Sequence, residues 1–147
     1  MAHVRKQIRD AVKATLTSGV PLVQRRVYAS RVHPLSQAKL PCVLVYTASE
    51  ASNLMTMGQR TILRELSMSV DIYVSMNDTF DDDVDAICVQ IEEAIAANRD
   101  FGGVAKETIL VATEIDFDGD TENPVGVARL TYNVQYVTTI GDVETAR

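Results

Sequence analysis

The sequence predicts an α+β fold, in which two α-helices pack on a mostly antiparallel, mixed β-sheet of four to five strands. Three observations lead to this fold class. Two segments repeat apolar residues at helical spacing, several others alternate with a period of two, and a cluster of turn-forming residues separates the last two strands into a β-hairpin at the C-terminal end. The elements follow the order α-β-β-β-α-β-β. A chain of 147 residues can bury one self-sufficient core, so we expect a single domain over residues 1–147.

The first helix is predicted over residues 3–17, because its apolar residues recur at helical spacing. We expect Ser18 and Gly19, followed by Pro21, to end it, with Gly19 as a left-handed cap. The apolar face consists of Val4, Ile8, Ala11, Val12, Thr15 and Leu16.

The second helix is predicted to begin after a cap at Asn77 or Asp78 and to end near Asn98. Its first turns are crowded with aspartates, which the helix dipole favours at this end. Its apolar stripe consists of Val84, Ile87, Cys88, Ile91, Ala94 and Ile95.

The first two strands differ in their patterns. Residues 22–28 predict a short strand at a sheet edge, which Arg25 and Arg26 protect from further pairing. After a loop at residues 31–39, residues 41–46 are apolar on both alternating faces, which is typical of an inner strand covered on both sides.

The later strands alternate more regularly. Residues 62–74 predict a long antiparallel strand with one face in the core. Residues 107–117 and 125–139 predict the last two strands, and the turn formers at residues 118–124 join them as a hairpin.

Residues 50–60 are polar and contain a glycine, so we interpret them as a loop between two strands. The loop carries Leu54, Met55 and Met57, which either cover the end of the domain's own core or contact a partner. We expect it to be mobile in the free subunit and to become ordered against a neighbouring subunit or another protein in an assembly.

The charge of the chain is divided between its two parts. Residues 1–40 hold eight basic groups and one acidic group, a net charge of +7, and the remainder has a net charge of −13. This division is either scatter over a solvated surface or self-complementarity. Copies that dock head to tail through opposite charges close into rings or continue as filaments. An overall charge of −6 argues against specific nucleic-acid binding.

No motif in the sequence predicts catalysis. The two histidines, His3 and His33, lie in no local motif with a nucleophile or carboxylate, and no glycine-rich phosphate loop is present. We therefore expect no enzymatic activity and no cofactor. Cys42 and Cys88 have no metal or redox spacing and are interpreted as reduced core thiols. No stretch is apolar enough to predict a signal peptide or a membrane span.

Two acidic segments invite a metal-binding interpretation. In the hairpin, acidic residues alternate as calcium ligands do, but the sixth position of a calcium loop is Thr121 in place of glycine, and the twelfth is Val127 in place of glutamate. Solvated strand ends explain the same residues, and a helix N-terminus explains the aspartates at 81–83. The acidic residues of the hairpin are Asp116, Asp118, Asp120 and Glu122.

Four segments carry a resemblance to a known family. They are residues 8–12 (IRDAV), 40–46 (LPCVLVY), 65–73 (ELSMSVDIY) and 128–136 (ARLTYNVQY), with an acidic-led helix before the last. In order, length and pattern the chain resembles the tail terminator proteins of long-tailed bacteriophages, the lambda type in particular.

The resemblance implies a structural virion protein of the phage tail, assembled in the host cytoplasm. Such a protein forms a homo-hexameric ring on the tail tube protein, stops tube growth, and offers the surface to which the head-tail connector or neck proteins join; DNA passes through the ring lumen. Two alternatives stay open: a head-to-tail joining or tail completion protein of the neck, and a small cytoplasmic ligand-binding domain or enzyme with its site at the acidic hairpin or near His33.

We expect contacts between subunits or with other tail proteins to use three groups of residues. The basic group is expected to meet the acidic groups of the next copy, and the apolar group to add buried area. The basic group is Arg25, Arg26 and Arg31; the apolar group is Leu54, Met55 and Met57; the acidic residues are Asp81, Asp82, Asp83, Asp116, Asp118 and Asp120.

Overall fold

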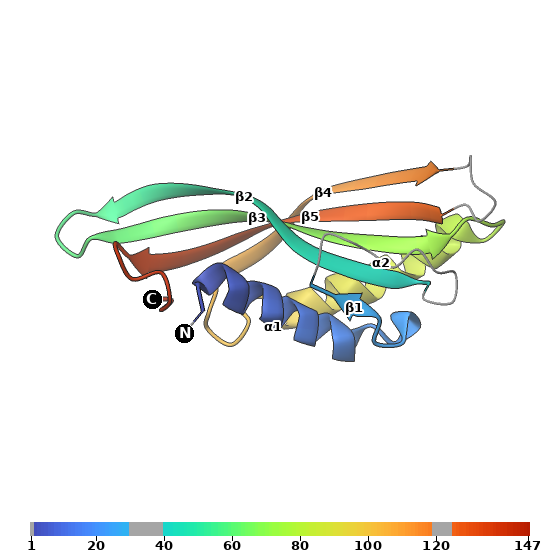
Figure 1. Ribbon diagram of the computed structural model, residues 1–147, viewed down its shortest axis with the longest axis horizontal. Coiled ribbons are helices and arrows are strands. Elements are labelled where there is room, and N and C mark those ends of the chain that lie inside the picture. The colour runs from blue at the N-terminus through green and yellow to red at the C-terminus, as the bar shows by residue number, and fades with distance from the viewer. Residues whose placement is uncertain (1, 30–39, 119–124) are drawn as a thin grey trace.

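Two helices lie against one face of a strongly twisted, five-stranded sheet (Figure 1). A computed structural model describes residues 2–29, 40–118 and 125–147. The elements are α1 (Val4–Gly19), the 3₁₀ turn η1 (Pro21–Val23), β1 (Val27–Tyr28), β2 (Cys42–Thr56), β3 (Thr61–Ser75), α2 (Phe80–Ala97), β4 (Glu107–Asp118) and β5 (Val125–Thr139). The strand order is β1-β2-β3-β5-β4; β1 is parallel to β2 and all other pairs are antiparallel. The predicted α+β class and C-terminal hairpin are confirmed.

The core lies between the helices and the sheet. Helix α1 contributes its predicted apolar face to this core. Helix α2 contributes its predicted stripe together with Phe80, although Cys88 and Ala94 of the stripe are only partly buried. From the sheet, β3 supplies alternate residues from Leu66 to Val74, as its period of two predicted. The most buried helical side chains are Val4, Ile8, Val12, Leu16, Val84, Ile91 and Ile95.

Gly19 is the last residue of α1, but it does not have the predicted cap conformation. Its backbone is not in the left-handed region, where only Gly102, Gly103 and Gly141 are found among the described glycines. A Cβ at Gly19 would lie 2.8 Å from the Cβ of Ala94 on α2. The glycine is therefore needed for close helix packing, and the prediction of a left-handed cap is wrong.

The start of α2 also differs by one or two residues from the prediction. Thr79 is the N-cap residue, and Asn77 assists it, because its Oδ1 accepts hydrogen bonds from both the backbone N–H and the hydroxyl of Thr79, each at 2.9 Å. The helix ends at its C-cap Asn98, as predicted.

The first predicted strand is much shorter than expected. Residues 21–23 form η1, and left-handed backbone angles at Gln24 and Arg25 (φ 51° and 67°) interrupt the extended chain. Only Val27 and Tyr28 pair with β2, at the predicted sheet edge. A period-two pattern cannot show such a turn, because it is specified by backbone angles and not by side-chain polarity.

The predicted loop at residues 50–60 is wrong. Strand β2 continues to Thr56, which pairs with Thr61, the first residue of β3. Only residues 57–60 remain as the turn of a long hairpin. Because this part of β2 extends past both helices, its side chains from Ala51 onward are exposed and its sequence lacks the apolar alternation of a core strand. We call residues 50–65 of this hairpin the arm.

Candidate assembly surfaces

A buried carboxylate fastens the base of the arm to the rest of the molecule. Glu50 has a side chain only 9% exposed, and its Oε2 accepts hydrogen bonds from Arg5 of α1 and Arg64 of β3, each at 3.1 Å. Its Oε1 accepts a hydrogen bond from the hydroxyl of Tyr136 on β5. Burial raises the pKa of the Tyr136 phenol, and the bond to Glu50 raises it further. Four elements thus meet at one carboxylate, which holds the arm in a fixed direction.

A second buried carboxylate joins three strands on the opposite face of the sheet. Asp71 is buried on β3 and accepts two hydrogen bonds from Arg129 on β5, at 2.9 and 3.2 Å, and one from the Tyr46 hydroxyl at 2.9 Å. These hydrogen bonds raise the pKa of the Arg129 guanidinium. Desolvation and the neighbouring Asp71 raise the pKa of the Tyr46 phenol.

Neither cluster was found by sequence reasoning. Arg64 is a charged residue on the otherwise apolar face of β3, whereas Asp71 lies on the opposite face, which is mostly polar in sequence. The pattern therefore offered a signal for Arg64 and none for Asp71. The partners lie 14 to 86 positions away, and sequence spacing alone does not identify them.

The apolar residues of the arm are presented to solvent. Leu54 and Met55 are 53% and 54% exposed on β2, and Met57 in the turn is 82% exposed. They therefore do not cover the end of the domain's own core, and contact with a partner is the interpretation that is left.

The predicted basic residues have different surroundings. Arg25 is exposed beside η1. Arg26 is partly buried, and its guanidinium donates to the backbone carbonyls of Pro41 at 2.9 Å and Leu40 at 3.2 Å. Arg26 therefore fixes the entry to β2 within its own chain, and Arg31 lies outside the described residues.

The predicted acidic residues are divided between two elements. Asp81 and Asp82 are exposed in the first turn of α2, while Asp83 accepts a hydrogen bond from the Thr79 hydroxyl at 3.0 Å. Asp116 is exposed on β4. The side chain of Asp118, and Asp120 and Glu122 entirely, lie outside the described part of the chain.

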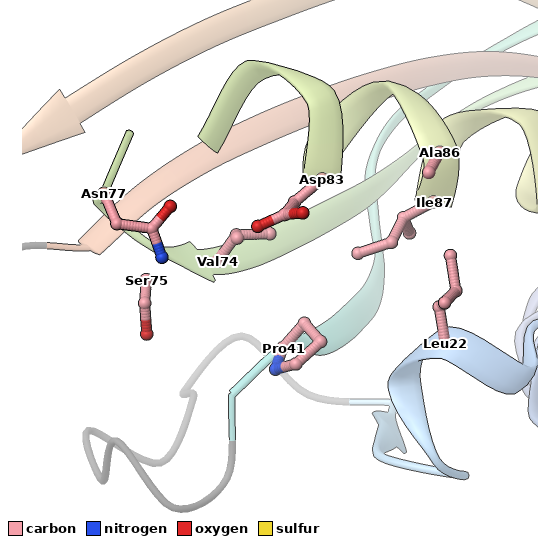
Figure 2. Close-up of a pocket in the computed structure, with 8 residues that line it drawn as sticks. All are labelled: Leu22, Pro41, Val74, Ser75, Asn77, Asp83, Ala86 and Ile87. Atoms are coloured by element: carbon pink, nitrogen blue, oxygen red, sulfur yellow. The ribbon is translucent and has the colours of Figure 1, made fainter. Parts of the chain in front are cut away.

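A cavity shows that η1, which precedes Arg25, and the first turn of α2 are neighbours. It measures about 380 Å³ and lies between η1, the start of β2, the end of β3 and α2. Figure 2 shows Leu22 and Pro41 facing Asp83 and Ile87 across it. Arg25, three residues after Leu22, and the aspartates at 81–83 are therefore at the same end of the molecule.

The cavity lining has few polar groups. Its lining supplies one carboxylate, Asp83, with the hydroxyl of Ser75, the amide of Asn77 and otherwise apolar side chains. His3 is far from it in the chain and caps α1, because its Nδ1 accepts the backbone N–H of Arg5 at 3.1 Å; burial lowers the pKa of its imidazole. Cys42 is buried and Cys88 half-buried, both as free thiols, and burial raises the pKa of each.

Within residues 2–29, 40–118 and 125–147, no three metal-ligating side chains converge. Of the acidic hairpin residues, this finding covers Asp116 only, because the others lie outside the described part. In the same ranges, no helix is long and apolar enough to cross a membrane.

A known protein family matches most of the chain. Residues 3–136 match the sequence model of the family described as phage minor tail protein U. One similar solved structure is a chain in the virion of a native gene transfer agent particle, with a TM-score of 0.45 and 10% identity over 87% of this chain and 94% of that chain. No curated protein sequence matches significantly.

Proposed function

Because the chain belongs to the phage minor tail protein U family and is thus a structural protein of the phage tail, we propose that it forms a homo-hexameric ring that caps the tail tube. The ring stops polymerisation of the tube protein and offers its other surface to the head-tail connector or neck proteins. It acts by assembly and not by catalysis, and DNA passes through its lumen.

The observation that carries this proposal is the arm. It extends past both helices, it is fastened at its base by Glu50, and it ends in Leu54, Met55 and Met57. Exposed apolar residues gathered on one projecting element are typical of a protein–protein contact. Burying them stabilises an interface by roughly 25 cal/mol per Å² of apolar surface, and six copies multiply the effect. We assign this contact to the tail tube or to a neighbouring subunit.

The test replaces Leu54, Met55 and Met57 together with serine. All three are more than half exposed, so we expect a melting temperature within a few degrees of the wild type, but failed ring formation or failed capping of purified tail tubes. Light scattering after size-exclusion chromatography measures the ring, and electron microscopy of tube lengths measures capping. Ile140→Ser, which changes an exposed apolar residue outside the arm, is the control. A large loss of monomer stability with assembly intact would contradict the role given to the arm.

A further inference from the structure

Exposed apolar side chains lie at two opposite ends of the molecule. At one end is the arm tip, which we define as residues 54–60 and which contains the three exposed apolar residues of the arm. At the other end is the cavity beside η1, whose wall includes Leu22, 44% exposed. Strand β3 runs from Thr61 at the arm tip to Val74 in the cavity lining (Figure 1). At about 3.3 Å per residue the two sites are about 40 Å apart, so a copy cannot place its arm tip in its own cavity.

The arm tip has a fixed shape. The hydroxyl groups of Thr56 and Thr61 are hydrogen-bonded at 2.9 Å across the base of the turn. The backbone N–H of Ile140 donates to the carbonyl of Arg60 at 2.8 Å, which holds the turn against the end of β5. Met57 projects from this turn and is 82% exposed. An element that is already ordered loses little conformational freedom when it binds, so the arm tip is suited to enter a preformed site.

The cavity has the size and the lining to receive an apolar side chain. Its volume of about 380 Å³ lies in the range of cavities that hold whole small molecules, about 300–1,000 Å³, so one methionine side chain fits in it. Methionine is unbranched and flexible, and it fills irregular apolar spaces well. The apolar lining residues are Leu22, Pro41, Val74, Ala86 and Ile87.

The two sites also carry opposite charge. Arg60 is exposed and is the charged residue of the arm tip. At the cavity, Asp83 lines the wall, and Asp81 and Asp82 are exposed beside it in the first turn of α2. Within the described part of the chain, neither Arg60 nor these two exposed aspartates make an ion pair. Arg25 is one cation at this end against three aspartates, so the entrance beside α2 attracts a positive group.

Pairing of like ends lacks this complementarity. Two arm tips in contact would bring two copies of Arg60 together, and two cavities in contact would bring two groups of aspartates together. A contact between unlike ends joins different surfaces of each copy. Such a contact repeats from copy to copy and closes into a ring when the rotation between copies allows it.

We propose that the arm tip of each copy docks in the cavity of the next copy, with Met57 among the apolar lining residues and Arg60 beside the aspartates at 81–83. The occupant of the cavity is thus a second copy of this chain. The inference rests on the proposed ring and assigns the arm to the contact between subunits.

The test is a disulfide between the arm tip and the cavity wall. Gln59→Cys leaves Met57 and Arg60 in place, and it is combined with Ala86→Cys on α2 or with Leu22→Cys on the opposite wall. A disulfide needs Cα atoms within about 7 Å, so neither pair can close within one copy. After mild oxidation we expect at least one pair to give a ladder of covalent oligomers up to the full ring, reversed by reductant.

The matched control is Gln59→Cys with Ala97→Cys. Ala97 is exposed on the same helix, but it lies about 16 Å beyond Ala86 at about 1.5 Å per residue, so this pair should give no ladder. Each single cysteine variant and the wild type, which retains Cys42 and Cys88, should give none either.

A second measurement fills the cavity. Ala86→Phe enlarges an exposed side chain of the lining, so we expect an unchanged melting temperature and loss of the ring at concentrations at which the wild type forms it. Ala97→Phe makes the same change outside the cavity and should leave the ring intact. Rings of Ala86→Phe as abundant as those of the wild type would contradict the docking.

Failure of the docking and failure of the ring give different results. If light scattering shows the ring but neither cysteine pair gives a ladder, the docking is wrong and the proposed ring stands. If the variant with serine at Leu54, Met55 and Met57 then still forms rings and fails only to cap tubes, the arm binds the tail tube instead. A ladder that stops at the dimer would show reciprocal docking of two copies and would contradict the ring. If no oligomer forms even with tail tubes present, the ring and the docking are both wrong.

Discussion

Tyr136 and Glu50, 86 positions apart in the chain, are joined by a hydrogen bond in which the phenol of β5 donates to the carboxylate of β2. The same carboxylate accepts from two arginines, and so it connects the arm to α1 and to the centre of the sheet. Tyr132, four residues earlier on the same strand, is equally buried, but its hydroxyl has no hydrogen-bond partner among the described residues.

The two tyrosines predict opposite results for the same substitution. Tyr136→Phe leaves Glu50 without one donor, so we expect the free energy of unfolding to fall by about 1–3 kcal/mol. Tyr132→Phe removes an unpartnered buried hydroxyl, so we expect no loss and a gain of up to about 1 kcal/mol. Urea unfolding at neutral pH measures both. Equal losses for the two variants would show that the bond to Glu50 contributes nothing specific.

Both phenols also predict how stability depends on pH. Their pKa values are raised in the folded chain above the ordinary value of 10.0, chiefly by burial. Above about pH 10 the unfolded chain loses protons that the folded chain keeps, so stability falls as pH rises. We expect the decline of the melting temperature above pH 10 to be less steep in Tyr136→Phe and Tyr132→Phe than in the wild type. Identical slopes would mean that these phenols have ordinary pKa values.

Arg25 and Arg26 are predicted to separate assembly from folding. Arg25→Glu reverses an exposed charge, so we expect an unchanged melting temperature and weaker, more salt-sensitive assembly, since exposed ion pairs contribute only about 0–1 kcal/mol each. Arg26→Ala removes donors to two backbone carbonyls, so we expect lower stability. Light scattering at low and high salt, with thermal unfolding, measures both effects. Assembly of Arg25→Glu at low salt equal to that of the wild type would remove Arg25 from the interface.

Residue patterns were sufficient for the elements that the core defines. The buried faces of α1, α2 and β3 follow from periods of 3.6 and 2, because burial on one side selects apolar residues at those spacings. The turn-forming residues between β4 and β5 were likewise enough to predict their hairpin.

Only the tertiary structure decided the arm, the shortened β1 and the two carboxylate clusters. From Ala51 to Thr56, β2 is held by its backbone pairing with β3 and not by burial, so no apolar alternation marks it as a strand. Glu50 and Asp71 acquire their roles from partners on other strands and on α1. Sequence determined which residues must leave water; the three-dimensional arrangement determined which distant groups meet, because hydrogen-bond partners are chosen by proximity in space and not by spacing in the chain.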